Sequence, residues 1–174
     1  IVGGILEEDE IKPNQANEKY YTGKGEYKNF IGPSSHSVLW PNYIERSLLF
    51  VDRNFRSLKN LNIEDVKSAI KFSDISSKIS QKEQTNFCHY VRSAHLMAYM
   101  TQSQYNQWLI RLYRSLEEAD LLDRLGFDDL GKFRENYSKY FWENYYSELT
   151  HVIPLLSETE EGKLLLATLY YRMG

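Results

Sequence analysis

Apolar residues recur at intervals of three and four along most of the chain after residue 41, which is the period of an amphipathic helix. The most extended pattern runs from Ser80 to Gly126 and predicts a pair of long helices. Ser80 and Glu83 have the spacing of a capping box, and Gly126 stands where a helix would end in a left-handed residue. The positions expected to face the core are Phe87, Val91, Ala94, Ala98, Thr101, Tyr105, Trp108, Leu109, Leu112, Tyr113, Leu116, Ala119 and Leu122.

The same spacing predicts helices on either side of this pair. Asn42, which follows Pro41, is the expected N-cap of one helix, and Asn62 begins a shorter one. Asp129 suits the start of a later helix, because its negative charge would lie at the positive end of the helix dipole. The expected core positions are Ile44, Leu48, Val51, Phe55 and Leu58 in the first, and Leu130, Phe133, Tyr137, Phe141, Tyr145 and Leu149 in the later one.

A last helix is predicted after Pro154. Ser157 and Glu160 have the spacing of a second capping box. The apolar side of this helix is expected to consist of Leu164, Leu165, Ala167, Thr168 and Tyr171.

Residues 1–41 lack a sustained period and contain three of the four prolines. We therefore expect an irregular arm over 1–41 and a helical domain over 42–174. Two short strands, at Tyr20-Tyr21 and from Tyr27 to Ile31, are possible around the turn Gly23-Lys24-Gly25. A mixed α+β fold with a small hairpin in the arm is the alternative to an all-α fold.

Amino-acid composition limits the classes of function that this chain is expected to have. The chain has 174 residues, enough for one domain with a real core, and a net charge of −3. That charge does not favour nucleic acid as a partner, because nucleic-acid binders usually carry a basic face. Aromatic residues are abundant, with 14 Tyr, 8 Phe and 3 Trp, and such residues suit both cores and protein interfaces.

Neither a disulfide framework nor a membrane span is indicated within the sequence. Cys88 is the single cysteine and is expected to be a small buried side chain. The apolar segment Ile1–Leu6 precedes four acidic residues, which fits either the tail of a removed membrane or signal segment or a disordered terminus. The first alternative favours an extracytoplasmic location and predicts a hydrophobic segment upstream of Ile1 in the full-length gene.

Candidate chemistry is sparse. Glu148 and His151 form a Glu-x-x-His pair of the kind that di-iron bundles use twice, but the second pair is missing. The carboxylates Glu135, Glu143 and Glu148 stand near aromatic residues, as in sugar sites, yet charges alternating with aromatics on one helix usually form a solvated face. We therefore predict no catalytic residue, no metal ligand and no cofactor.

The sequence thus predicts an all-α fold, an antiparallel-type bundle of about five helices preceded by an irregular N-terminal arm. The favoured function is non-enzymatic: a domain that binds another protein, as the extracytoplasmic part of a membrane-anchored or secreted assembly. The alternative is a helical enzyme of the metal-carboxylate or glycan-cleaving type. The candidate partner-binding residues are Tyr140, Trp142, Tyr145, Tyr146, Tyr20 and Tyr21.

Overall fold

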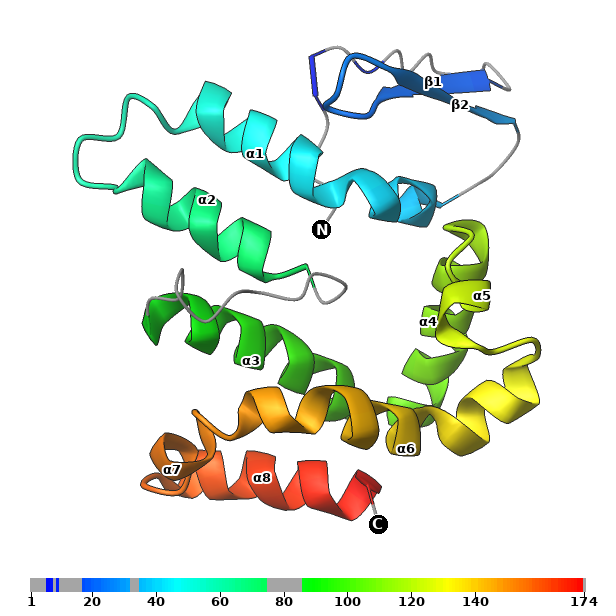
Figure 1. Cartoon of the computed structure of the whole chain (residues 1–174), viewed down its shortest axis with the longest axis vertical. Helices are drawn as coiled ribbons and strands as arrows, with labels where there is room; N and C mark the ends of the chain where they lie inside the picture. Colours follow the sequence, from blue (N-terminus) through cyan, green and yellow to red (C-terminus); the bar gives the residue numbers. More distant parts are fainter. Residues whose placement is uncertain (1–5, 8, 10–16, 32–34, 75–85, 174) are drawn as a thin grey trace. The chain divides into compact units, whose positions relative to one another are not determined.

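The computed structural model describes residues 6–7, 9, 17–31, 35–74 and 86–173. These residues form two compact units. The first contains residues up to 74 together with 114–122, and the second contains 86–113 and 123–173. Each unit is described by itself below, with the element labels of Figure 1.

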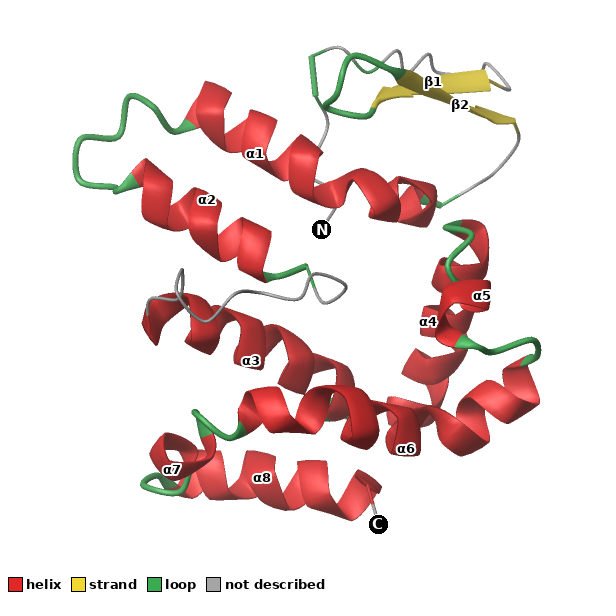
Figure 2. Ribbon diagram, in the orientation of Figure 1, coloured by secondary structure: helices red, strands yellow, loops and turns green. Residues whose placement is uncertain are grey.

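The first unit begins with a two-stranded antiparallel hairpin. Strand β1 (Asn17–Tyr21) pairs with β2 (Tyr27–Ile31), so that Tyr21 lies opposite Tyr27 (Figure 2). Gly23 and Gly25 have φ angles of 90° and 92°, which residues with a side chain rarely adopt. The small hairpin considered for the arm is therefore confirmed, and the glycines explain why the chain turns there.

Three helical segments follow: η1 (His36–Asn42, a 3-10 helix), α1 (Tyr43–Asn54) and α2 (Ile63–Phe72). Asn62 caps α2 as expected, because its side-chain oxygen accepts the amide protons of Glu64 and Asp65. Asn42 stands at the N-cap position of α1, as predicted, but its side chain makes no capping bond. The prediction for Leu58 is wrong, because α1 ends at Asn54 and Leu58 lies exposed in the following turns.

The second unit contains α3 (Asn86–Met100), α6 (Leu130–Leu149), α7 (Ile153–Leu156) and α8 (Glu160–Met173). Helices α3, α6 and α8 pack pairwise against one another (Figure 1). Two connecting helices complete the fold: α4 (Tyr105–Glu118), which leaves the second unit after Tyr113, and α5 (Leu122–Leu125).

Helices α4 and α6 follow the predicted pattern. Asp129 caps α6 by accepting the amide proton of Lys132, and Gly126 after α5 has a φ of 74°. The predicted core positions in α4 and α6 that are buried are Leu109, Leu112, Tyr113, Leu116, Phe133, Tyr137, Phe141 and Leu149. The predicted fold class, a mainly helical bundle with an irregular N-terminal arm, is confirmed.

The predicted core face of α3 is wrong. Phe87, Ala94 and Ala98 are exposed, and the buried residues are Cys88, Arg92, Ser93, Leu96, Met97 and Met100. Helix α3 is apolar around most of its circumference, so spacing alone does not select the buried side. Arg92 lies on the buried side, where it pairs with Glu148 of α6. The capping box expected at Ser80 and Glu83 lies outside the described residues.

The predicted core face of α8 is wrong as well. Leu164, Leu165 and Tyr171 are exposed, whereas Gly162, Leu166 and Leu169 are buried. The N-cap is Thr159 rather than Ser157, because the Thr159 hydroxyl accepts the amide proton of Gly162. The apolar side chains found by spacing therefore form the outer face of this helix.

Candidate functional site

Three aromatic side chains meet at the surface between α6 and α8, and two of them are stacked. The rings of Trp142 and Tyr146 are parallel to within 17°, with centroids 3.8 Å apart. The Tyr146 hydroxyl lies 3.1 Å from the hydroxyl of Tyr170 on α8. Trp142 remains 43% exposed and Tyr170 41% exposed. We call these three residues the aromatic ladder.

The ladder is positioned by α6 and α8. Trp142 and Tyr146 stand four residues apart on α6, about one helical turn, so their rings lie next to each other. The hydrogen bond between Tyr146 and Tyr170 then joins this pair to α8. The ladder is thus held in place by contacts from two helices.

Tyr140 and Tyr145 occupy a different environment. They are half-buried and belong to a cluster of rings in which Tyr140 lies 5.5 Å from Phe127 and 5.8 Å from Tyr145. Burial, together with the hydrogen bond to Tyr140, raises the pKa of Tyr145 well above its ordinary value, so its hydroxyl stays protonated. The four aromatic residues expected to form one surface are therefore divided into two groups.

The candidate residues of the arm have structural contacts. Tyr20 is buried, and the Arg46 guanidinium lies 5.9 Å from the centre of its ring. The Tyr21 hydroxyl accepts the amide proton of Gly25 and closes the hairpin turn. Burial removes Tyr20 from the candidate contact surface, while Tyr21 keeps only partial exposure.

Tyr170 was missed by sequence reasoning. It lies 24 residues from Tyr146, and no helical period relates two residues in separate helices. Its pKa is raised, first because of the hydrogen bond with Tyr146 and second because of burial. Only the packing of α8 against α6 brings these two side chains together.

The Glu-x-x-His pair lies where α3 packs against α6. Glu148 is held by Arg92 through two hydrogen bonds, one of them 2.9 Å from Nη2 to Oε1. His151 lies 4.9 Å, between ring centres, from His89 on α3. Burial lowers the pKa of His89, and the neighbouring His151 lowers it further. Within the part of the chain that the structure describes, no group of three or more potential ligands is arranged to hold a metal ion.

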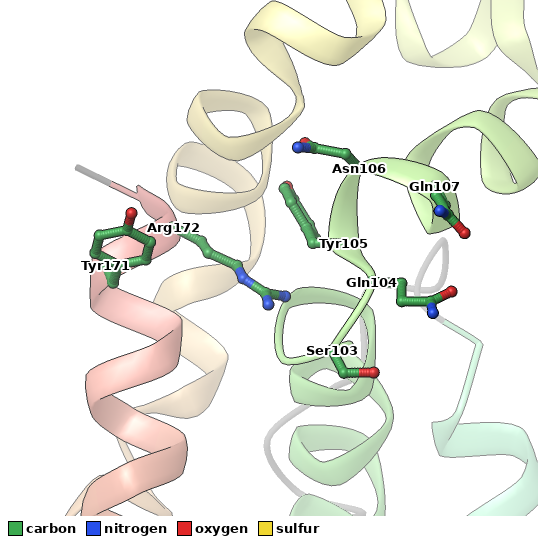
Figure 3. Close-up of a pocket in the computed structure, with 7 residues that line it drawn as sticks. All are labelled: Ser103, Gln104, Tyr105, Asn106, Gln107, Tyr171 and Arg172. Carbon is green, nitrogen blue, oxygen red and sulfur yellow. The ribbon is translucent and has the colours of Figure 1, made fainter.

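An open pocket of about 480 Å³ lies between the start of α4 and the end of α8 (Figure 3). Arg172 enters it from α8, donates a hydrogen bond of 2.7 Å to the carbonyl of Met100, and lies 4.8 Å from the centre of the Tyr105 ring. The remaining lining residues carry no charge and are Ser103, Gln104, Asn106, Gln107 and Tyr171. The pocket therefore combines one cation with amide and hydroxyl groups.

None of the helices in the described ranges combines the length and hydrophobicity that crossing a membrane requires. The family model described as Npun_R2479-like matches residues 2–173, which is nearly the whole chain. No curated protein and no solved structure matches the chain.

Proposed function

We propose that this chain, which belongs to the Npun_R2479-like family, is a non-enzymatic domain that binds another protein through the aromatic ladder. The observation that supports this proposal most directly is the stacked, solvent-facing pair of Trp142 and Tyr146, joined to Tyr170 by a hydrogen bond.

Stacked aromatic rings suit protein recognition for two reasons. Trp and Tyr are enriched among the residues that dominate binding energy, because each offers a large apolar face together with a polar group. The ladder is also ordered before binding, since each ring is held by its neighbour. Little side-chain entropy is then lost when a partner docks, and more of the contact energy contributes to affinity.

The chemistry of the ladder also suggests the kind of surface that would bind it. The exposed indole of Trp142 favours contact with apolar or aromatic side chains. The hydroxyls of Tyr146 and Tyr170 favour hydrogen-bonding groups beside that apolar contact. We therefore expect a partner whose contact surface has an apolar centre and a polar edge.

The proposal is tested by affinity capture with the full chain, followed by measurement of the dissociation constant for the purified partner. Trp142→Ala should weaken binding of that partner about tenfold or more, because truncation of a central aromatic residue typically costs about 2 kcal/mol or more. Tyr146→Ala should have an effect in the same direction, since it removes the ring on which Trp142 stacks.

Tyr27→Ala is the matched control. Tyr27 is 47% exposed, similar to Trp142, and lies in the hairpin. This variant should keep the affinity of the unmodified chain. Circular dichroism should show that the variants are folded. If the partner then binds the Trp142 and Tyr146 variants as tightly as the unmodified chain, the proposal is contradicted.

The predicted extracytoplasmic, membrane-anchored location stays a prediction. It rests on Ile1–Leu6 and the acidic residues that follow, and residues 1–5 lie outside the described part of the chain.

A further inference from the structure

Helix α8 carries a second apolar surface, separate from the aromatic ladder. Leu164 is 70% exposed, although leucine is among the residue types most often buried, and the aromatic ring of Tyr171 is 86% exposed. Ala167 is also exposed and Thr168 is half-buried. At about 100° per residue these four residues lie together, opposite the buried Gly162, Leu166 and Leu169. We call Leu164, Ala167, Thr168 and Tyr171 the outer stripe.

A surface helix of a soluble domain usually has one apolar side and one polar side. Helix α8 instead has apolar residues on two opposite sides. The Thr168 hydroxyl even donates to the carbonyl of Leu164, so this polar group is satisfied within the helix. The outer stripe therefore has the residue types of a surface that another molecule covers, and lacks the charged residues of a surface that faces solvent.

Along the outer stripe the side chains run large, small, small, large, so their sizes follow the same order from either end of the helix. A large residue stands at each end, Leu164 and Tyr171, and the two smaller residues Ala167 and Thr168 stand between them. When two such helices pack in opposite directions, each large residue of one lies beside a large residue of the other. The smaller residues then face each other and allow a close approach of the helix axes.

The charges at the two ends of α8 have opposite signs. Glu160, Glu161 and Lys163 lie near its beginning, where Lys163 pairs with Glu160, so Glu161 is the charge at this end that the pair does not offset. Arg172 lies near the other end, inside the open pocket with Gln104 and Gln107. Glu161 and Arg172 lie on the same flank of the outer stripe, by helix geometry. In an antiparallel pair the acidic beginning of one helix therefore approaches the basic end of the other, and the two helix dipoles also oppose each other favourably.

We propose that the outer stripe of α8 is the contact between two copies of this chain. The two helices pack antiparallel about a two-fold axis near Ala167 and Thr168, and Glu161 of each copy reaches the pocket around Arg172 of the other. A two-fold contact requires one surface to be complementary to itself, and the order of sizes and charges along α8 meets that requirement.

The expected dimer is weak and depends on concentration. A stable protein interface buries about 800 Å² on each partner. The outer stripe extends only about 10 Å along the helix from Leu164 to Tyr171, at 1.5 Å per residue. Leu165 on its flank, which is 40% exposed, adds to this contact without making it large.

Sedimentation velocity of the full chain over a concentration series tests the proposal. The unmodified chain should shift from monomer to dimer as concentration rises, while Leu164→Glu and Tyr171→Glu should remain monomeric over the same range. Both side chains are exposed, so these variants should fold normally. The matched control is Leu58→Glu, which alters a leucine that is 50% exposed in the other unit and should leave the dimer unchanged.

Disulfide trapping tests the antiparallel direction. In a Cys88→Ala background, which removes the single native thiol, Ala167→Cys should form a covalent dimer under mild oxidation. A chain with Leu164→Cys should not cross-link to itself but should cross-link to a chain with Tyr171→Cys. Self-cross-linking of the Leu164→Cys chain without mixed cross-linking would indicate a parallel pair and contradict the proposal.

Two further outcomes would overturn the inference. One is a chain that stays monomeric at every concentration. The other is a dimer that persists in both glutamate variants, which would place the contact elsewhere. Because Trp142 is not in the outer stripe, Trp142→Ala should still dimerise, so failure of the aromatic-ladder proposal and failure of this inference can be distinguished.

Discussion

Arg46 and Asp9 form an ion pair whose two side chains are completely buried. Two guanidinium nitrogens donate to Asp9 over 2.8 and 2.9 Å, and the carboxylate also accepts the amide protons of Leu6 and Tyr21. Burial acts to raise the pKa of Asp9, but the hydrogen bonds from Arg46, Leu6 and Tyr21 outweigh burial and lower it. The pair thus ties the N-terminal segment and the hairpin to α1.

Arg46→Met should lower the free energy of unfolding by about 3–5 kcal/mol, because it leaves the Asp9 carboxylate buried without its cation. Urea unfolding measures this change. Since the folded pKa of Asp9 is lowered, the contribution of the pair is complete above pH 3.8 and decreases as the pH falls through the folded value. The control Arg56→Met removes an exposed ion pair with Asp52 and should cost less than about 1 kcal/mol. Equal losses in the two variants would contradict the structural role of Arg46.

At the scale of elements, the contact between α7 and α8 depends on a glycine. A Cβ atom placed on Gly162 would lie 2.0 Å from the carbonyl oxygen of Leu156, which is far closer than any normal contact. The neighbouring atoms belong to the backbone, so they cannot move aside as a flexible side chain could. The absence of a side chain at Gly162 therefore permits this packing and, with it, the side of α8 that faces outward.

Gly162→Ala should destabilise the chain by roughly 1–3 kcal/mol, because the steric clash exceeds the gain in helix propensity of at most about 1 kcal/mol. Thermal unfolding by circular dichroism measures the change. Gly131→Ala is the comparison variant in α6: its added Cβ would lie 3.0 Å from the Asp129 oxygen that caps this helix, so it should cost no more than the loss of a cap, about 1 kcal/mol. A Gly162→Ala variant as stable as the Gly131→Ala variant would show that α7 and α8 do not pack this closely.

At the scale of the whole molecule, the described residues divide into two compact units, and the chain enters the first unit again at 114–122. The Asp9–Arg46 pair lies in the first unit, and the Arg92–Glu148 pair lies in the second. The first pair is completely buried and the second is partly buried, so each unit has its own ionic contact.

Hydrogen exchange should detect these units separately. Arg46→Met should increase amide exchange in the hairpin and α1 more than in α6 and α8, and Gly162→Ala should show the reverse order. Units with separate cores open at different free energies, so a local loss of stability should stay within its own unit. Uniform acceleration across both units in either variant would indicate a single cooperative unit instead.

The success of sequence reasoning differed from helix to helix. In α6 it identified the buried Phe133, Tyr137 and Phe141, which follow one another at intervals of four residues and so lie on one side of that helix. In α3 and α8 it selected exposed positions such as Phe87 and Leu164, because those helices are apolar on more than one side. Of the candidate site, Trp142 and Tyr146 could be named from sequence, whereas Tyr170 could not.

The sequence by itself determined the mainly helical fold, the glycine turn of the hairpin and several helix ends. Helical period, capping and positive φ angles are local properties, and each depends on residues only a few positions apart. Tertiary structure alone decided which sides of α3 and α8 face inward, because that choice depends on contacts between separate helices, such as Arg92 with Glu148 and Gly162 with Leu156. It also decided that Tyr170 completes the aromatic ladder, since a contact between two helices has no signal in the spacing of either one.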